Sequence, residues 1–293
     1  MTDSSAEATI RLAVATAAET LERIRDPLSD RGIAAAHLPT RERAIPLDEP
    51  IDGFDVGFVF PPRVVEGATA AALADIPWVN DRRAVLRSRN KAEVIARLER
   101  ADLPVPRTVL VSDPVPEATL QTAFSRFDGG VVVKPTTTTR GVGVARATDL
   151  DTFLGICDYV GLVHDFPATG DKSFLVQEFL PEARDIRAMV LEGTVVGAVE
   201  RRLPSESGAN DRWKHNVHRG ARATPIDPSP RIRRLAERTA AALEIDFLGV
   251  DLLATPDRVV VSETNARPTI DDAEKYDPDF YDRPARRIRS RLR

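Results

Sequence analysis

The chain opens with short apolar runs and one amphipathic stretch, which is the pattern of an α/β unit. The runs that predict strands are residues 10–15, 33–38, 56–60 and 77–80. Between the first two, Leu21, Ile24 and Leu28 recur at helical spacing and predict a helix. Run 56–60 is apolar throughout and ends at two prolines, as in a buried parallel strand that leads into a surface loop. These elements predict a first domain over residues 1–85.

Residues 86–173 predict a second, mixed segment. Val94, Ile95 and Leu98 mark a helix that begins near Asn90. The strands expected here are residues 108–111, 131–135 and 141–144, with a helix over 117–127. The last two strands flank a polar stretch of small residues, so we expect a hairpin with a polar tip.

Residues 174–293 have an antiparallel pattern. We expect strands over 174–180, 186–191 and 195–201, a helix over 231–243 capped by Ser229, and a hairpin formed by 247–254 and 258–264. The turn of this hairpin is Thr255, Pro256 and Asp257. Residues 283–293 carry six arginines. A solvated helical face is the expected role of these arginines, and a contact with RNA or an acidic protein is the alternative.

Composition excludes several classes of protein. With 293 residues and 42% hydrophobic content, the chain has the length of about two domains and enough apolar residues to fill their cores. The net charge of −4 gives no basic excess, which disfavours binding to nucleic acid. Cys157 is the only cysteine and cannot form an internal disulfide, and neither an export signal nor a membrane-spanning run is indicated. We therefore expect a cytoplasmic protein.

The last hairpin predicts a metal site. Counting outward from Asp257 places Asp251 opposite Glu263, and strand alternation puts Asn265 on the same face. Two carboxylates and an amide are suited to Mg²⁺ that holds phosphates. The alternative is a pair of solvated carboxylates with Asn265 as a cap, and a register slip of one residue would separate the set.

Two further segments are suited to binding anions. Lys134 ends an apolar strand beside the polar stretch 136–143, which predicts a phosphate cradle; an ordinary surface lysine is the alternative. Residues 212–220 gather a tryptophan, two histidines and three cations in one loop, and they lack the Cys or His partners of a zinc site. The glycine fingerprints of P-loop and dinucleotide-binding proteins do not occur in the sequence. The chain has only five lysines among its 41 basic residues; base composition of the genome explains this, or some sites need a compact ammonium.

Taken in order, residues 82–268 resemble the ATP-grasp superfamily, and within it the RimK-type amino-acid ligases. The resemblance implies an α/β ATP-grasp fold, with an N-terminal domain over 1–85 and two α+β lobes, 86–173 and 174–293, that clasp the nucleotide. It also implies site residues. Phosphates are bound by Lys91, Lys134, Gly141 and Gly143, and the adenine edge by the hinge residues Gln177, Glu178, Phe179 and Leu180. Asp185 lies near the ribose, and the magnesium ligands are Asp251, Glu263 and Asn265.

The implied catalytic residues are Arg187, Lys214 and Asn216, of which the last two also contact the nucleotide. The implied activity joins a carboxylate to an amine with ATP and two magnesium or manganese ions, through an acyl phosphate. The amine is glutamate or a similar amino acid, and the acceptor is an acidic small molecule, a cofactor or a protein terminus. The arginines that indicate an anionic acceptor are Arg201, Arg202, Arg212 and Arg219.

Two departures from the family pattern keep other functions open. Four threonines, residues 136–139, stand where a Ser-x-Gly segment is usual, and Lys214 replaces a common arginine. A kinase on the same fold and a nucleotide-binding module without turnover are the alternatives. No membrane partner is expected, and a homo-oligomer is left open.

Overall fold

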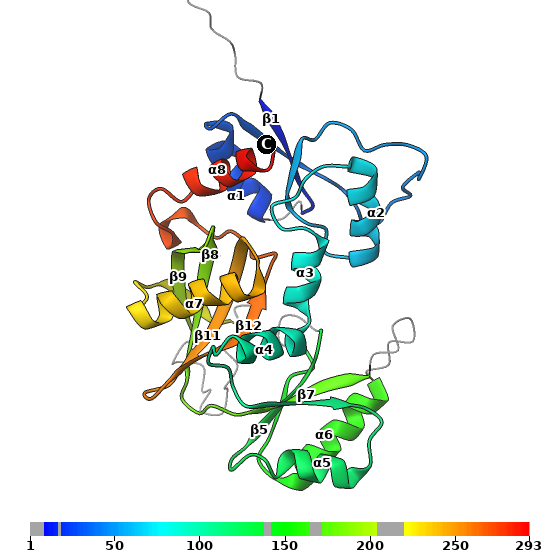
Figure 1. Cartoon of the computed structure of the whole chain (residues 1–293), viewed down its shortest axis with the longest axis vertical. Helices are drawn as coiled ribbons and strands as arrows, with labels where there is room; N and C mark the ends of the chain where they lie inside the picture. The colour runs from blue at the N-terminus through cyan, green and yellow to red at the C-terminus, as the bar shows by residue number, and fades with distance from the viewer. Residues whose placement is uncertain (1–8, 17–18, 138–141, 164–171, 204–219, 293) are drawn as a thin grey trace, which may run out of the picture.

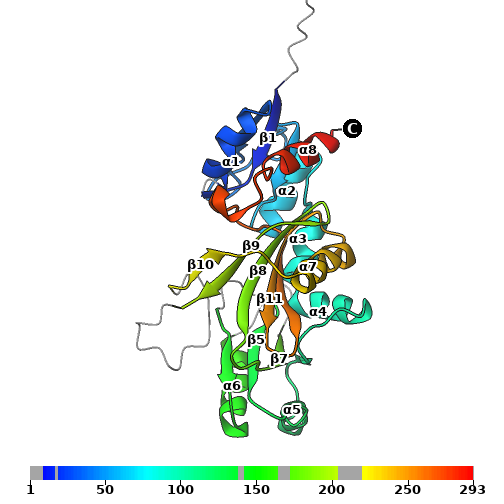
Figure 2. The ribbon, with the colours of Figure 1, turned by 90° about the vertical axis from the view of Figure 1, so that its left-hand side faces the viewer.

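The computed structural model describes residues 9–16, 19–137, 142–163, 172–203 and 220–292. Three sheets follow one another along the long axis of the molecule (Figure 1). The N-terminal sheet lies at one end, a five-stranded sheet in the middle and a four-stranded sheet at the other end, and the view turned by 90° shows the same order (Figure 2). No helix within the described ranges is long and apolar enough to cross a membrane.

The N-terminal sheet is parallel and has the order β2-β1-β3, as the buried apolar runs predicted. Its elements are β1 (Ile10–Val14), α1 (Glu19–Ser29), β2 (Ile33–His37), β3 (Val56–Val59) and α2 (Val64–Ala74). The expected strand over residues 77–80 is reduced to a single bridge between Gly57 and Trp78. A helix from the other end of the chain packs against this part of the molecule. Ala285 and Ile288 of α8 (Asp282–Ser290) are buried in the same apolar cluster as the strands of the N-terminal sheet.

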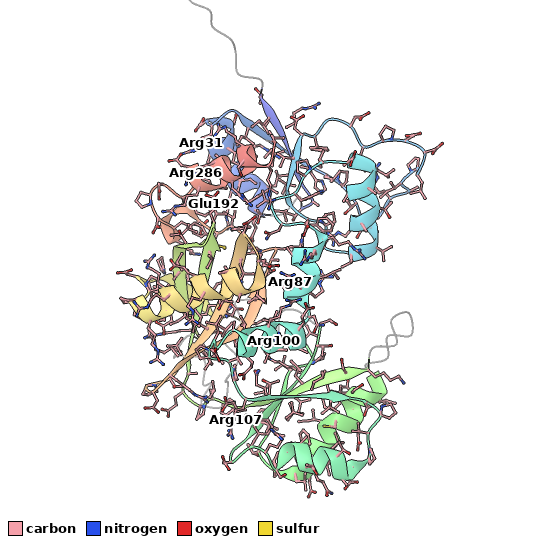
Figure 3. All side chains as sticks on the ribbon, in the orientation of Figure 1. Arg31, Arg87, Arg100, Arg107, Glu192 and Arg286 are labelled. Atoms are coloured by element: carbon pink, nitrogen blue, oxygen red, sulfur yellow. The ribbon has the colours of Figure 1, made fainter. Side chains whose placement is uncertain are left out.

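Several arginines in and just after α8 pair with acidic side chains. Arg287 and Arg291 both donate to Asp246, and Arg286 lies 3.5 Å from Glu192 (Figure 3). Part of the arginine-rich face is therefore ion-paired, while Arg286 and Arg289 are exposed, as expected of a solvated face. The acidic partners Asp246 and Glu192 lie about 40 residues or more earlier in the chain, so local charge patterning could not indicate them.

The five-stranded sheet is antiparallel with the order β10-β9-β8-β11-β12. Its strands are β8 (Arg184–Leu191), β9 (Thr194–Arg202), β10 (Arg222–Pro225), β11 (Phe247–Ala254) and β12 (Val259–Asn265). One face packs against α3 (Arg82–Arg89), α4 (Lys91–Arg100) and α7 (Pro230–Leu243). As predicted, the Ser229 side chain caps α7, accepting from the Ile232 N–H at 3.4 Å. The opposite face is left to carry polar side chains at its far end.

The four-stranded sheet has the order β4-β7-β5-β6 and is covered by two helices. Its elements are β4 (Thr108–Ser112), α5 (Glu117–Phe124), β5 (Val131–Pro135), β6 (Ala145–Ala147), α6 (Leu150–Val163) and β7 (Ser173–Glu178). The hairpin strand expected over 141–144 is displaced, since Gly143 has φ +73°, a left-handed conformation that interrupts a strand. β7 pairs with β4 and β5, so the strand expected to open the last lobe belongs to this sheet instead.

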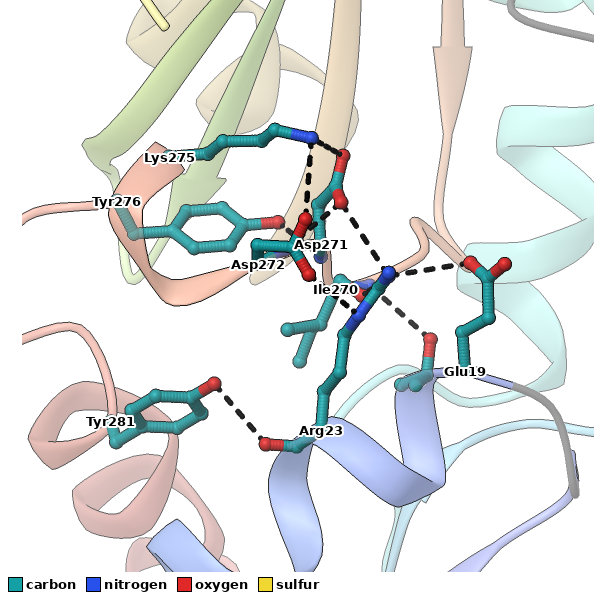
Figure 4. A network of polar contacts seen from close by, with 9 residues as sticks. Glu19, Arg23, Ile270, Asp271, Asp272, Lys275, Tyr276 and Tyr281 are labelled. Carbon is teal, nitrogen blue, oxygen red and sulfur yellow. Dashed lines mark hydrogen bonds and ion pairs between the residues drawn. The ribbon is translucent and has the colours of Figure 1, made fainter.

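The segment after β12 is fixed to the N-terminal domain by Arg23 of α1 (Figure 4). Arg23 donates to the Ile270 carbonyl at 3.0 Å and lies 3.3 Å from Asp272. Lys275, in the short 3₁₀ helix η2 (Ala273–Lys275), pairs with Asp271 at 2.7 Å. These contacts hold the end of the central sheet next to the carboxyl ends of β1 and β3.

Candidate functional site

The predicted opposition of Asp251 and Glu263 is confirmed, and a β-bulge produces it. Near the turn, Leu252 pairs with Val261, a register that alone would set Ser262 opposite Asp251. The register then shifts by one residue, so that Glu263 faces Asp251. The Ser262 hydroxyl donates to the Asp251 carbonyl at 3.2 Å. A bulge inserts an extra residue and re-aims the side chains that follow it.

Two arginines on the strands β8 and β9 also hold Asp251. Arg187 on β8 lies directly opposite Asp251 and donates to both carboxylate oxygens, at 2.7 and 2.8 Å. Arg201 on β9 lies 3.3 Å from the same carboxylate and donates to Asp185 at 3.1 Å. Neighbouring strands thus bring two aspartates and two arginines onto one face.

Burial makes this cluster electrostatically strong. Burial alone would raise the pKa of Asp251, but Arg187 and Arg201 outweigh it and lower the value to about 2. The same attraction to Asp251 raises the pKa of Arg187. For Asp185, burial outweighs the attraction of Arg201, and the pKa is raised. Asp251 is therefore ionised at neutral pH and available as an anionic ligand.

Glu263 meets the first residue of α4. The Lys91 ammonium lies 3.2 Å from the Glu263 carboxylate, and the Lys91 N–H donates to the Thr136 carbonyl at 3.1 Å. The Asn90 side chain caps the helix by accepting from the Glu93 N–H. The lysine is buried whereas Glu263 is half-buried, so this pair lies at the edge of an accessible region. Lys91 thereby connects β12 to the loop after β5.

Lys134 on β5 is buried within a short polar chain. Its ammonium donates to Gln177 at 2.9 Å, and the Gln177 amide donates to the Thr108 hydroxyl at 2.8 Å. Burial lowers the pKa of Lys134 to about 8, with a further lowering by the charge of Lys91 and an opposing effect of Glu263. The two lysines and Glu263 are thus electrostatically linked across two sheets.

The hinge residues 177–180 lie at the end of β7. The N–H groups of Glu178 and Phe179 donate to the Arg107 and Gly130 carbonyls, both at 3.0 Å. The Glu178 carboxylate accepts from Arg258, at the tip of the last hairpin, at 2.7 Å. Glu178 thus ties the four-stranded sheet to the five-stranded sheet, and its N–H and that of Phe179 are already paired.

Gly143 approaches β5 so closely that no side chain fits there. A Cβ on this residue would lie 2.9 Å from Cγ of Pro135, in addition to the strain of its positive φ. Three other predicted site residues, Gly141, Lys214 and Asn216, lie outside the described residues. So do Arg212 and Arg219 of the expected acceptor contacts.

The donor set on the last hairpin fits a hard divalent cation. Asp251 and Glu263 supply carboxylate oxygens, and Asn265 supplies an amide oxygen that accepts from the Arg267 N–H at 2.9 Å and keeps a second lone pair. No group of three or more His, Cys, Asp or Glu suited to a metal occurs in the described part of the chain. A metal here would complete its coordination with further oxygen atoms, from water or from a bound ligand.

Sequence reasoning missed how far the site is paired internally. Arg201 was expected at an acceptor, yet it joins Asp185 and Asp251, and Arg202 donates to Glu200 at 2.7 Å. The buried position of Gln177 beside Lys134 was also unexpected. A regular pairing counted from the turn would set Asp185 opposite Glu200, and a register shift between Met189 and Val190 brings Arg201 opposite Asp185 instead, so the residue pattern could not indicate this contact.

Comparison with known proteins points to one family. A family model described as a RimK-like ATP-grasp domain matches residues 88–278. A probable alpha-L-glutamate ligase of Marinomonas sp. is 30% identical over 200 residues, 67% of this chain and 61% of that protein. The ribosomal protein bS6 L-glutamate ligase of Shigella boydii is 31% identical over 201 residues, 67% of this chain and 62% of that protein. The chain thus covers less than two thirds of the length of these relatives.

Solved structures agree on the fold. The RimK domain ATP-grasp protein of Sphaerobacter thermophilus superimposes with a TM-score of 0.63 at 20% identity, covering 88% of this chain and 92% of that one. D-alanyl-alanine synthetase A of Vibrio cholerae gives a TM-score of 0.71 at 15% identity, covering 98% of both chains. The expected α/β ATP-grasp fold is therefore confirmed.

Proposed function

Because the chain belongs to the RimK-like ATP-grasp family, we propose that it is an ATP-dependent ligase that joins a carboxylate to the amine of an amino acid. The observation that carries the proposal is the single face on which Asp251, Glu263 and Arg187 meet, next to Lys91 and Lys134. Carboxylates suited to a cation and cations suited to phosphates lie there within one site.

The reaction has two steps. An oxygen of the acceptor carboxylate attacks the γ-phosphorus of ATP, which forms an acyl phosphate and releases ADP. The amine then attacks the acyl carbon, the C–O bond to phosphate breaks, and an amide, inorganic phosphate and one proton are produced. Phosphoryl transfer needs alignment and charge neutralisation more than covalent help from the protein.

The residues of this chain would divide that work. Lys91 and Lys134 would hold the phosphates, and Arg187 would stabilise the negative charge that develops on the transferred group. Asp251, Glu263 and Asn265 would hold two magnesium ions, which neutralise phosphate charge when bound. Since Arg187 and Lys91 pair with these carboxylates in the structure, we infer that nucleotide binding exchanges the pairs, with cations moving to phosphates and carboxylates to metal.

The hinge would receive the adenine. The N–H groups of Glu178 and Phe179 serve the sheet, so the N–H of Leu180 and the main-chain carbonyls of 178–180 are the groups we propose for the adenine edge. Asp185 would lie by the ribose. Gly141 and Gly143 would let the phosphate loop approach closely, and Lys214 and Asn216 would complete the nucleotide site.

The proposed substrates are taken from the names of the relatives. Two of them are named as glutamate ligases, one for ribosomal protein bS6, so we propose glutamate as the amino acid and a protein terminus, a peptide or an acidic small molecule as the acceptor. A steady-state assay of phosphate release with Mg²⁺ and ATP tests this. Release should require both an amine and an acidic acceptor and disappear in an Asp251→Asn/Glu263→Gln variant. Formation of ADP without dependence on an amine would indicate a kinase, and binding without turnover a nucleotide-binding module.

A further inference from the structure

Arg89 and Arg267 lie where two segments of the chain meet, and a third arginine, Arg41, is near enough for its charge to act on Arg267. Arg89 is the last residue of α3, Arg267 follows β12, and Arg41 lies in the loop after β2. Arg89 donates to the Pro62 carbonyl at 2.7 Å, and Arg267 donates to the Phe60 carbonyl. Because the two acceptors are two residues apart, the guanidinium groups lie beside each other along the stretch that follows β3.

These cations lack the acidic partners that other arginines of the protein have. Arg89 and Arg267 are half-buried, and Arg41 is exposed. No described carboxylate forms an ion pair with Arg41, Arg89 or Arg267, whereas Arg187 has one such partner and Arg201 has two. Like charges packed together are unfavourable unless an anion joins them.

The cluster adjoins the site described above. Arg89 precedes Lys91 by two residues, and Arg267 follows Asn265 by two. These two stretches run side by side, because Ser88 and Thr264 share a hydrogen bond of 3.0 Å and Lys91 lies 3.2 Å from Glu263. The cluster also lies at the carboxyl ends of β2 and β3, the edge where open parallel sheets bind ligands. An anion held there would be next to the reacting groups.

We propose that Arg41, Arg89 and Arg267 bind a carboxylate of a substrate that carries at least two, the bound group being one that does not react. The proposal rests on the ligase function. Planar guanidinium groups match carboxylates with paired hydrogen bonds, whereas the groups proposed to hold phosphates in this chain are lysines. The arginines expected at an acceptor from sequence, Arg201 and Arg202, are occupied by Asp185, Asp251 and Glu200. The substrate is the glutamate-type amino acid or the acidic acceptor, and the experiment separates these two sources.

Calorimetric titration of the full-length protein saturated with Mg²⁺ and AMP-PNP provides the test. The probes are L-glutamate, its neutral isostere L-glutamine, and N-acetyl-Glu-Glu as a model acceptor. The variants are Arg267→Gln and Arg41→Ala, of which the second changes an exposed residue and leaves the main-chain anchors intact. Arg43→Ala, an exposed arginine of the same loop, is the matched control.

We expect the wild type to bind at least one acidic probe. In Arg267→Gln and Arg41→Ala, the Kd of that probe should rise by about tenfold or more. The Kd of AMP-PNP should stay within twofold in both variants, and Arg43→Ala should behave as the wild type. If the variants bind L-glutamate more weakly and no longer prefer it to L-glutamine, the cluster binds the amino acid. If they bind N-acetyl-Glu-Glu more weakly, the cluster binds the acceptor. The inference is overturned if the wild type binds neither acidic probe, or if both variants bind the probes as tightly as the wild type. In either case, binding of AMP-PNP shows that the proposed ligase function still stands. Failure of the wild type to bind AMP-PNP contradicts the ligase function itself.

Discussion

Arg187 and Asp251 face each other across β8 and β11 and share two hydrogen bonds, of 2.7 and 2.8 Å. The pair joins the group proposed for the transferred phosphate to the group proposed for the metal. Each holds the other ionised, since Arg187 and Arg201 keep the pKa of Asp251 at about 2. Asp251 is thus ionised at neutral pH before any ligand binds.

Asp251→Asn should lower the rate of phosphate release by about 100-fold or more, because a proposed metal ligand is lost and Arg187 is left without its charged partner. The dependence on Mg²⁺ should shift to higher concentration. Steady-state assays over a Mg²⁺ series measure both effects. Asp257→Asn, in the turn of the same hairpin, is the control and should leave the rate unchanged; equal rates for the two variants would contradict the assignment of Asp251.

Lys134→Met should stabilise the protein at pH 7. The folded-state pKa of about 8 lies below the ordinary value of 10.5, so above pH 8 the unfolded chain binds more protons and the unfolding free energy rises with pH until about 10.5. Below pH 8 the full cost of burying the charged lysine remains. Removing that charge should relieve a cost of roughly 3 kcal/mol at pH 7, offset in part because the buried Gln177 amide oxygen loses its donor, and the difference from wild type should shrink between pH 8 and 10.5.

Urea unfolding at pH 7, 9 and 10.5 measures this difference. The variant should also lose nucleotide binding, since Lys134 is proposed to hold phosphate. A stability difference that does not change with pH, or a variant less stable than wild type at pH 7, would show that Lys134 is not held as an unfavourable buried cation.

Gly143→Ala should weaken nucleotide binding several-fold and destabilise the fold by about 1 kcal/mol, because a Cβ at φ +73° meets Pro135. Gly129→Ala is the matched control, since it lies just before the same strand and a Cβ there meets nothing within 4 Å. Titration with AMP-PNP and thermal melting compare the two. Similar behaviour of both variants would argue that the approach of Gly143 to β5 does not matter.

Asn80→Ala should be the most destabilising of these substitutions. The side chain of Asn80 is buried, donates to the Phe247 and Ala266 carbonyls at 2.5 and 2.7 Å, and accepts from the Phe247 N–H at 3.3 Å. Removing it leaves three buried main-chain groups unpaired, for a loss of about 3 kcal/mol. Asp81→Ala removes only the cap of α3 and should cost about 1 kcal/mol. Equal losses in urea unfolding would contradict this account of the domain contact.

Local patterns predicted most strands and the helices over 91–100 and 231–243, because their apolar spacing and caps lie within a few residues. They also placed Asp251 opposite Glu263, by counting an equal number of residues on either side of Asp257. The strand pairs next to the turn do not follow that count. The observed turn sets a different register at its tip, and the bulge at Ser262 restores the expected pair.

Other features depend on contacts that local patterns do not encode. Arg201 and Asp185 meet through the pairing of β8 with β9, and β7 joins the sheet of β4 and β5 across long loops. Of the strand expected over 141–144, the described residues 142–144 are not in a strand, and β6 begins at Ala145; the residue pattern did not indicate the positive φ of Gly143. Arg89 and Arg267 donate to main-chain carbonyls that lie 27 and 207 residues away in sequence.

The most direct test of the proposed ligase is the fate of the acceptor oxygen. N-acetyl-Glu-Glu and other acidic acceptors labelled with ¹⁸O in their carboxylates would be incubated with the protein, ATP, Mg²⁺ and L-glutamate, and the released phosphate analysed by mass spectrometry. Attack of the carboxylate on ATP followed by amide formation transfers one labelled oxygen, so the account predicts phosphate that carries a single ¹⁸O, in an amount equal to the amide formed. Unlabelled phosphate, or ADP formed with a phosphorylated acceptor and no amide, would contradict it.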